Sequence, residues 1–313
     1  MTRTSRSGGA MALATAALLT LTACGGGGDP MSTSTGDATA TGAETTAGGS
    51  DQAVVIGSAN FSESILLAHV YAGALKNAGV NASTNTGIGS REIYLKALED
   101  GSIDVIPEYT GALGFFYDSE FAETDPDAVY EAIQGLIPED FAVLERSEAE
   151  DNDSVVVTRE TADEFGLSSI ADLADVAGEL SFGAPPEFET RPQGLSGLEE
   201  TYGITFATFR PLTGQALVQA LQNGQVDAAN IFSTDPAIAV NELVVLEDTE
   251  KLFGSQNMVP LVRAEVADLV REPLNAVSAA LTTEKVTEML RQTDVEQRNP
   301  EEVAAEFLEE AGL

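Results

Sequence analysis

The chain has very few of the side chains that enzymes most often use as general bases and nucleophiles. Its 313 residues include one histidine and one cysteine. One cysteine cannot form a disulfide within the chain or a cysteine-rich metal site. The histidine, His69, lies in an expected helix without an acidic or cysteine neighbour in sequence, which is more typical of a packed or surface residue than of a catalytic base. We therefore expect no enzyme activity, no cofactor and no bound metal.

Two weaker signals for catalysis or nucleotide binding do not change this expectation. The segment from Gly87 to Ser90 lacks the Gly-Lys-Ser/Thr that completes a phosphate-binding loop, so it is better interpreted as a turn entering a helix. Glu108 and Glu187 could form a catalytic carboxylate pair, but nothing in the sequence fixes the distance between them.

Basic residues are scarce as well. The chain has 15 lysines and arginines against 51 acidic residues, a formal net charge of −36. Nucleic-acid binding requires clustered basic side chains, so this composition argues against it. The acidic residues are dispersed, which predicts a solvated anionic surface. Tolerance of high salt and a weak attraction for cations are further hypotheses from the same charge.

Long hydrophobic segments are confined to the amino terminus. Residues 10–21 form an apolar run that is too short to span a membrane as a mature helix, and Arg3 and Arg6 precede it. This order is typical of a signal peptide, which we place at residues 1–23.

The signal peptide ends in a pattern that resembles the lipobox of bacterial lipoproteins, Leu-Thr-Ala-Cys at residues 21–24. The resemblance implies that Cys24 is lipidated and anchors the protein on the outer face of the cytoplasmic membrane. An ordinary cleaved signal with a stray cysteine is the alternative. Residues 24–52 are rich in glycine, serine, threonine and alanine, so we expect a flexible linker.

Residues 87–111 predict a helix, a tight turn and a buried strand. Gly101 suits the left-handed residue that ends a helix, and Pro107 is expected to stop the strand. Tyr109 and Thr110 would then lie just past the carboxyl end of a strand, where ligands bind in open α/β sheets.

The same pattern recurs 123 positions later. Residues 95–111 and 218–234 align without a gap, and an aromatic residue followed by a hydroxyl ends both segments. The matched pairs are Ala97 and Ala220, Leu98 and Leu221, Gly101 and Gly224, Asp104 and Asp227, Tyr109 and Phe232, and Thr110 and Ser233. The repeat favours two related lobes; a common α/β unit used twice without a shared role is the alternative.

Apolar strand patterns alternating with helical ones predict two α/β lobes with a cleft between them and a discontinuous first lobe. We place lobe 1 at residues 53–157 and 259–313, and lobe 2 at residues 158–258. The cleft would be lined at the strand ends by aromatic, hydroxyl, amide and guanidinium groups. These candidate ligand-binding residues are Asn60, Phe61, Tyr109, Thr110, Arg191, Phe232, Ser233 and Thr234.

Aromatic faces attract quaternary ammonium groups, and an arginine can hold a carboxylate with two hydrogen bonds. Together they would suit a small zwitterion such as a betaine. Core packing is the alternative role for each aromatic ring.

At these residues the chain resembles the glycine betaine/choline/osmoprotectant substrate-binding proteins of ABC transporters. The matching phrases are GSANFSE at 57–63, LEDGSIDVIPEYTG at 98–111, GAPPEFETRP at 183–192 and DAANIFSTD at 227–235. The resemblance implies a type II periplasmic-binding fold and a tyrosine-rich cage for the ammonium group. By motif, Tyr109, Thr110, Phe232 and Thr234 carry over, but Phe232 stands where better-studied cages have tyrosine.

From these features we predict a lipid-anchored, monomeric solute receptor that delivers an osmoprotectant, such as glycine betaine, choline or carnitine, to an ABC permease with its ATPase subunit. Two alternatives remain. One is a sensory or regulatory binding domain of the same fold, and the other is a receptor for another small solute such as an amino acid.

Overall fold

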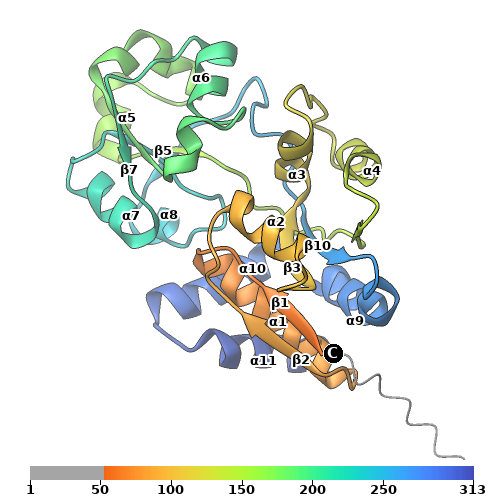
Figure 1. Cartoon of the computed structure of the whole chain (residues 1–313). Coiled ribbons are helices and arrows are strands. Elements are labelled where there is room, and N and C mark those ends of the chain that lie inside the picture. Colours follow the sequence, from red (N-terminus) through yellow and green to blue (C-terminus); the bar gives the residue numbers. More distant parts are fainter. Residues whose placement is uncertain (1–52) are drawn as a thin grey trace, which may run out of the picture. The chain divides into compact units, whose positions relative to one another are not determined.

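The computed structural model describes residues 53–313, which form two α/β lobes, each built on a five-stranded sheet (Figure 1). The predicted signal peptide, Cys24 and linker, residues 1–52, lie outside the described residues. Among residues 53–313, no helix combines the length and the apolar character needed to cross a bilayer.

The first lobe has the strand order β2-β1-β3-β10-β4, in which β1, β2 and β3 are parallel and β10 is antiparallel to β3 and β4. Its first part comprises β1 (Val54–Gly57), α1 (Ser62–Asn77), β2 (Ala82–Asn85), α2 (Arg91–Glu99), β3 (Val105–Tyr109), α3 (Thr110–Tyr117), α4 (Pro126–Leu136) and β4 (Phe141–Val143). The chain returns to this lobe with β10 (Met258–Arg263), α9 (Ala267–Ala280), α10 (Thr283–Leu290), the π-helix η4 (Arg291–Val295) and α11 (Pro300–Ala311). The predicted discontinuous first lobe is confirmed.

The second lobe has the strand order β7-β6-β8-β5-β9, with β6, β7 and β8 parallel and β5 antiparallel to β8 and β9. Its strands and α-helices are β5 (Val155–Val157), α5 (Arg159–Phe165), β6 (Ser181–Ala184), α6 (Leu195–Tyr202), β7 (Thr208–Pro211), α7 (Gly214–Gln222), β8 (Ala228–Asn230), α8 (Ala237–Val240) and β9 (Val244–Val245). Three short 3-10 helices complete it, η1 (Ile170–Asp175), η2 (Ala177–Glu179) and η3 (Pro186–Glu189).

The two strand orders correspond position by position, with β5 taking in the second sheet the place that β10 takes in the first. We expected lobe 1 to extend through residue 157, but β5 is hydrogen-bonded into the second sheet, where Val156 pairs with Ala229. Three consecutive valines identify a buried strand, but an apolar run does not specify the sheet in which that strand pairs.

The repeated sequence pattern is one structural unit used once in each lobe. Helices α2 and α7 are followed by the left-handed glycines Gly101 (φ 77°) and Gly224 (φ 64°). The carboxylate of Asp104 then accepts a hydrogen bond from the backbone N–H of Val55 at 2.8 Å. Asp227 does the same for the N–H of Ser181 at 2.7 Å. Each carboxylate therefore ties the strand that follows it to the neighbouring parallel strand, β3 to β1 in the first sheet and β8 to β6 in the second.

Strand β3 continues through Pro107, which we expected to stop it, and ends at Tyr109. Pro107 lies opposite Pro260 in the antiparallel β3–β10 ladder. The hydrogen bonds that Thr110 and Arg263 donate across this ladder, to Asn257 and Asp104, set a register in which the two prolines form a non-hydrogen-bonded pair. No proline N–H is needed there, so the strand runs on and carries Tyr109 to its carboxyl end.

Two crossover segments, residues 144–154 and 254–258, link the lobes side by side. The N–H of Asp151 donates to the carbonyl of Gln256 at 3.1 Å, and the N–H of Met258 donates to that of Ala149 at 3.0 Å. Glu150 and Asn257 form an antiparallel bridge between them. Residues of both segments therefore lie at the base of any cleft between the sheets.

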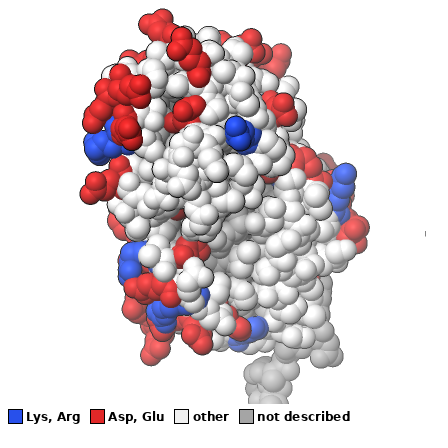
Figure 2. All heavy atoms as spheres, turned by 90° about the vertical axis from the view of Figure 1, so that its left-hand side faces the viewer, with Lys and Arg blue, Asp and Glu red and all other residues white. Residues whose placement is uncertain are grey.

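Helix α11 packs along α1 in the first lobe (Figure 1), and both contribute buried apolar side chains to the same hydrophobic core. The anionic composition is visible at the surface. On the face shown in Figure 2, acidic side chains cover far more area than basic ones. The predicted anionic surface is thus present on this face.

Candidate ligand-binding site

A cavity of about 300 Å³ lies between the two lobes and is lined by residues of both. Its lining includes the loop after β1, the end of β3, the loop after β6, the start of α7 and the segment after β8, together with residues of α2, the crossovers and η4. Six of the eight candidate residues from the sequence line this cavity, namely Asn60, Phe61, Tyr109, Arg191, Phe232 and Thr234. Whether each of them contacts a solute remains a prediction.

The other two candidates, Thr110 and Ser233, do not line the cavity. The Thr110 hydroxyl is buried, donates to the carbonyl of Ser255 and accepts the N–H of Asn257, so it secures a crossover segment. The Ser233 hydroxyl accepts the N–H of Asn152 in the other crossover. Each lies next to a lining residue in sequence, but its hydroxyl hydrogen-bonds to a crossover segment and serves the connection between the lobes.

Three aromatic rings from both lobes gather in the cavity. The ring centroid of Phe61 lies 6.3 Å from that of Tyr109 and 5.4 Å from that of Phe232, with both pairs tilted. Phe61 and Tyr109 come from the first lobe and Phe232 from the second. Phe61 is thus the central ring of an aromatic cluster that spans the cleft, and Phe232 occupies the place that the repeat predicted for a counterpart of Tyr109.

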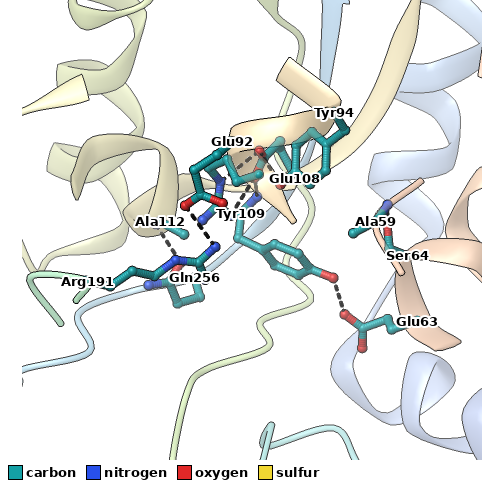
Figure 3. A network of polar contacts seen from close by, with 11 residues as sticks. Ala59, Glu63, Ser64, Glu92, Tyr94, Glu108, Tyr109, Ala112, Arg191 and Gln256 are labelled. Carbon is teal, nitrogen blue, oxygen red and sulfur yellow. Dashed lines mark hydrogen bonds and ion pairs between the residues drawn. The ribbon is translucent and has the colours of Figure 1, made fainter. Parts of the chain in front are cut away.

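The loop after β6 forms the second lobe's part of the rim. Gly194 ends this loop, and a Cβ there would lie 1.8 Å from the carbonyl oxygen of Phe188, so only glycine fits. Before it, Arg191 reaches across the cleft to within 3.5 Å of the Glu92 carboxylate on α2 (Figure 3). Gln193 is buried, and its Oε1 has no hydrogen-bond partner among residues 53–313.

A buried ion pair, which the sequence did not reveal, supports the first lobe's wall. The Arg91 guanidinium donates two hydrogen bonds to the Glu108 carboxylate, both 2.9 Å. The same carboxylate accepts from the Tyr94 hydroxyl at 2.7 Å and from the Tyr109 N–H at 3.0 Å. Because Arg91 and Tyr94 are one turn apart on α2, they fix this helix against β3 and orient the backbone that carries Tyr109.

A second buried polar group connects the lobes at the base of the cavity. The Tyr109 hydroxyl donates to Glu63 Oε1 at 2.5 Å (Figure 3). The hydroxyl oxygen of Thr234, from the second lobe, lies 2.6 Å from Glu63 Oε2 and 2.9 Å from Asp151 Oδ1. Asp151 belongs to the crossover and also accepts the Thr234 N–H at 3.1 Å. We name Glu63 and Asp151 the acid pair.

Burial raises the pKa of Glu63, and hydrogen bonds from Thr234 and Tyr109 offset part of this effect. Burial also raises the pKa of Asp151 well above its ordinary value, and the negative charge of Glu63 adds to the rise. Glu63 ends the phrase GSANFSE at 57–63, but its contacts with Tyr109 and Thr234 were not predicted from the sequence. Its position in the first turn of α1, directly after the loop with Asn60 and Phe61, was the available signal.

His69 lies half-buried on α1 and outside the cavity lining, as its sequence context predicted. Burial lowers its pKa.

Two α/β lobes that are joined by paired crossovers and enclose a solute-sized cavity define the class of two-lobed solute-binding proteins. Comparison with known sequences identifies the family. Residues 52–310 match the family described as the substrate binding domain of the ABC-type glycine betaine transport system, and the chain belongs to this family. It is therefore a substrate-binding protein of ABC-type transport and not an enzyme, as the sequence predicted.

The chain is also similar to individual proteins. A glycine-betaine-binding protein of Pseudomonas aeruginosa is 30% identical over 275 residues, which cover 82% of this chain and 88% of the relative. A chemotactic signal transduction system substrate-binding protein of Halobacterium salinarum is 25% identical over 279 residues, with 82% and 83% covered. A crystal structure of a glycine betaine/carnitine/choline ABC transporter protein superposes with a TM-score of 0.67 at 24% identity, covering 83% of this chain and 98% of that one. The last comparison confirms the type II periplasmic-binding fold.

Proposed function

We propose that this protein is the receptor of an ABC importer for a small quaternary-ammonium osmoprotectant. The observation that carries the proposal is the aromatic cluster of Phe61, Tyr109 and Phe232, which brings rings from both lobes to one cavity. Aromatic faces attract quaternary ammonium groups by about 0.5–2 kcal/mol per contact, the larger values applying when the contact excludes water. A cation held against the exposed sides of these rings would contact both lobes and so favour their closed arrangement.

The other polar groups of the cavity complete the proposed site. Arg191 offers a guanidinium at the rim for the carboxylate of a zwitterion, and Asn60 offers an amide. Thr234 belongs to the site through its contact with the acid pair rather than as a free hydroxyl. Thr110 and Ser233 act in this proposal only by holding the crossovers.

Binding is tested by calorimetric titration and thermal unfolding with glycine betaine, choline, carnitine and a panel of amino acids. A ligand at about 100 times its dissociation constant is expected to stabilise the protein by about 2.7 kcal/mol. We expect this for at least one quaternary-ammonium solute and for no amino acid without such a group. Tyr109→Ala should abolish the shift, while Thr110→Ser, outside the cavity lining, should keep it. Stabilisation by amino acids alone would refute the proposed ligand class.

We further propose that Cys24 carries the lipid anchor and that the receptor acts outside the cytoplasmic membrane beside a permease with its ATPase subunit. The lipobox-like residues 21–24 and the family support this. In the native host, Cys24→Ser is expected to move most of the protein from the membrane fraction to the soluble or secreted fraction. Wild-type fractionation by the Cys24→Ser protein would show that another segment attaches it to the membrane.

A sensory receptor is the second candidate, favoured by the chemotactic relative from Halobacterium salinarum. Both candidates bind the same solute, so binding does not separate them. Loss of radiolabelled solute uptake on deletion of the gene supports the importer. Unchanged uptake together with loss of a behavioural response would support the sensor.

A further inference from the structure

The cavity carries more acid than base. Its lining includes two arginines, Arg91 and Arg191, which already lie against Glu108 and Glu92 respectively. Six carboxyl groups line the same cavity, those of Glu63, Asp151, Asp153, Glu187, Asp235 and Asp294. Glu63 and Asp151 are 3% and 4% exposed, so water does little to screen them. A cavity with this lining attracts net positive charge.

The hydrogen-bond geometry of the acid pair requires a proton. The Thr234 hydroxyl oxygen lies within hydrogen-bond distance of Glu63 Oε2, 2.6 Å, and of Asp151 Oδ1, 2.9 Å. A hydroxyl has one hydrogen to donate, so it can satisfy one carboxylate only. Asp151 also accepts the Thr234 N–H, and Glu63 accepts from Tyr109, but the close approach of both carboxyl oxygens to the Thr234 oxygen is favourable only when one carboxyl is protonated and donates to it. One proton therefore resides on the acid pair while the cleft holds this arrangement.

The surroundings favour the same protonation state. Tyr109 on β3 donates to Glu63, and the negative charge of Glu63 contributes to the raised pKa of Tyr71 on α1. Asp235, after β8, adds a negative charge near Glu63, and burial raises the pKa of Asp153, beside Asp151 in the crossover, and of Asp294 on η4. The charged groups facing the pair are thus mostly acidic, and the two arginines bind elsewhere. Two carboxyl groups that share a site, as Glu63 and Asp151 do, do not both ionise readily unless a cation compensates their charge.

The aromatic cluster would place such a cation beside the pair. Tyr109 belongs to the cluster and also donates to Glu63, and Phe61 is two residues before Glu63 in the chain. We propose that a net-positive quaternary-ammonium alcohol replaces the proton of the Glu63–Asp151 pair on binding, so that the receptor prefers such cations to zwitterions. The proton leaves to solvent, the permanent charge of the solute takes its place, and the net charge of the closed cavity is unchanged. This inference rests on the proposed function.

Gln193 adds an independent observation in favour of an alcohol. Gln193 lines the cavity, and its buried Oε1 has no hydrogen-bond partner among the described residues. A buried unsatisfied acceptor is costly and is relieved by a donor from the solute. Choline has a hydroxyl group to donate, whereas glycine betaine has no N–H or O–H group at all.

Choline and glycine betaine form a matched pair of probes, because both carry the same trimethylammonium group and only choline is a net cation. Calorimetric titrations in buffers of different ionisation enthalpy, from about pH 5 to about pH 8, count the protons released. We expect choline to release close to one proton at the acid end of the range. Its affinity should there increase by up to about tenfold for each unit by which the pH rises, because binding that releases a proton is favoured at higher pH. Glycine betaine should bind more weakly and release less than half as much.

Variants assign the proton to the pair. Asp151→Asn, and separately Glu63→Gln, should reduce the release on choline binding to less than a third of the wild-type value. Asp175→Asn makes the same chemical change at an exposed position outside the cavity lining and should leave the release unchanged. Choline binding without proton release in the wild type, or tighter binding of glycine betaine than of choline, would overturn the inference while the proposed function stands. Absence of binding by any quaternary-ammonium solute would overturn both.

The ligand-free protein gives a second measurement. Because the pKa values of both carboxyls are raised in the folded chain, it retains a proton that the unfolded chain, with carboxyl pKa values near about 4, has lost. The stabilisation of the folded state by this proton is fully present below about pH 4. It is lost as the pH rises through the raised pKa values of the acid pair. Wild type and Asp175→Asn should therefore lose more thermal stability between about pH 5 and pH 8 than Asp151→Asn. Parallel curves would contradict a shared proton. His69, whose pKa is lowered, titrates in all three proteins alike, so it does not contribute to the difference between their stability curves.

Discussion

Replacing Arg91 by alanine is expected to lower the free energy of unfolding of the ligand-free protein by about 3–5 kcal/mol. The substitution removes two hydrogen bonds of 2.9 Å and leaves the fully buried Glu108 carboxylate without its counter-ion. The cost of that unpaired buried charge, rather than the loss of attraction alone, determines the size of the effect. Urea unfolding followed by circular dichroism measures it.

Arg146 provides the matched control. It forms an ion pair with Asp127, whose side chain is 90% exposed, so Arg146→Ala should cost about 0–1 kcal/mol. A double variant, Arg91→Ala with Glu108→Gln, should recover part of the loss because it no longer buries a charge. A loss below about 1.5 kcal/mol for Arg91→Ala would show that Glu108 finds another partner.

Replacing Phe61 by alanine is expected to weaken the binding of a quaternary-ammonium solute by about 30-fold, which corresponds to about 2 kcal/mol. Phe61 contacts both Tyr109 and Phe232, so its removal leaves Tyr109 of the first lobe without an aromatic connection to Phe232 of the second lobe. Calorimetric titration with the best ligand of the panel measures the loss.

Two further substitutions separate the aromatic face from apolar volume. Phe61→Leu keeps much of the volume without a π-face and should weaken binding nearly as much as alanine, whereas Phe61→Tyr should bind within about threefold of wild type. Phe116→Ala removes a ring that is 41% exposed and outside the cavity lining, and it should leave affinity unchanged. Wild-type affinity in Phe61→Leu would remove the cation–π contact from the proposed site.

The repeat was the most informative signal in the sequence. Because Asp104 and Asp227 each bind the parallel strand beside the one that they precede, the repeated pattern encodes the same local unit twice, and local units can be recognised from local sequence. The aromatic ends, Tyr109 and Phe232, followed from it and both line the cavity. The prediction failed for the hydroxyl residues that come directly after them, Thr110 and Ser233, which do not line the cavity. Successive side chains at a strand end point in different directions, so a residue next to a lining residue need not reach the cavity.

The chain by itself determined the class of fold, the discontinuous first lobe and six residues of the cavity lining, because glycine turns, apolar periodicity and strand-end motifs act over short distances. Only the tertiary structure decided where β5 pairs, that Thr110 and Ser233 hold the crossovers, and that Arg91 meets Glu108. It also brought Glu63, Asp151 and Thr234 together from α1, a crossover and the segment after β8. These contacts join residues that are separated in the chain by 83 and by 171 positions. They depend on how the lobes close, so no local sequence pattern predicts them.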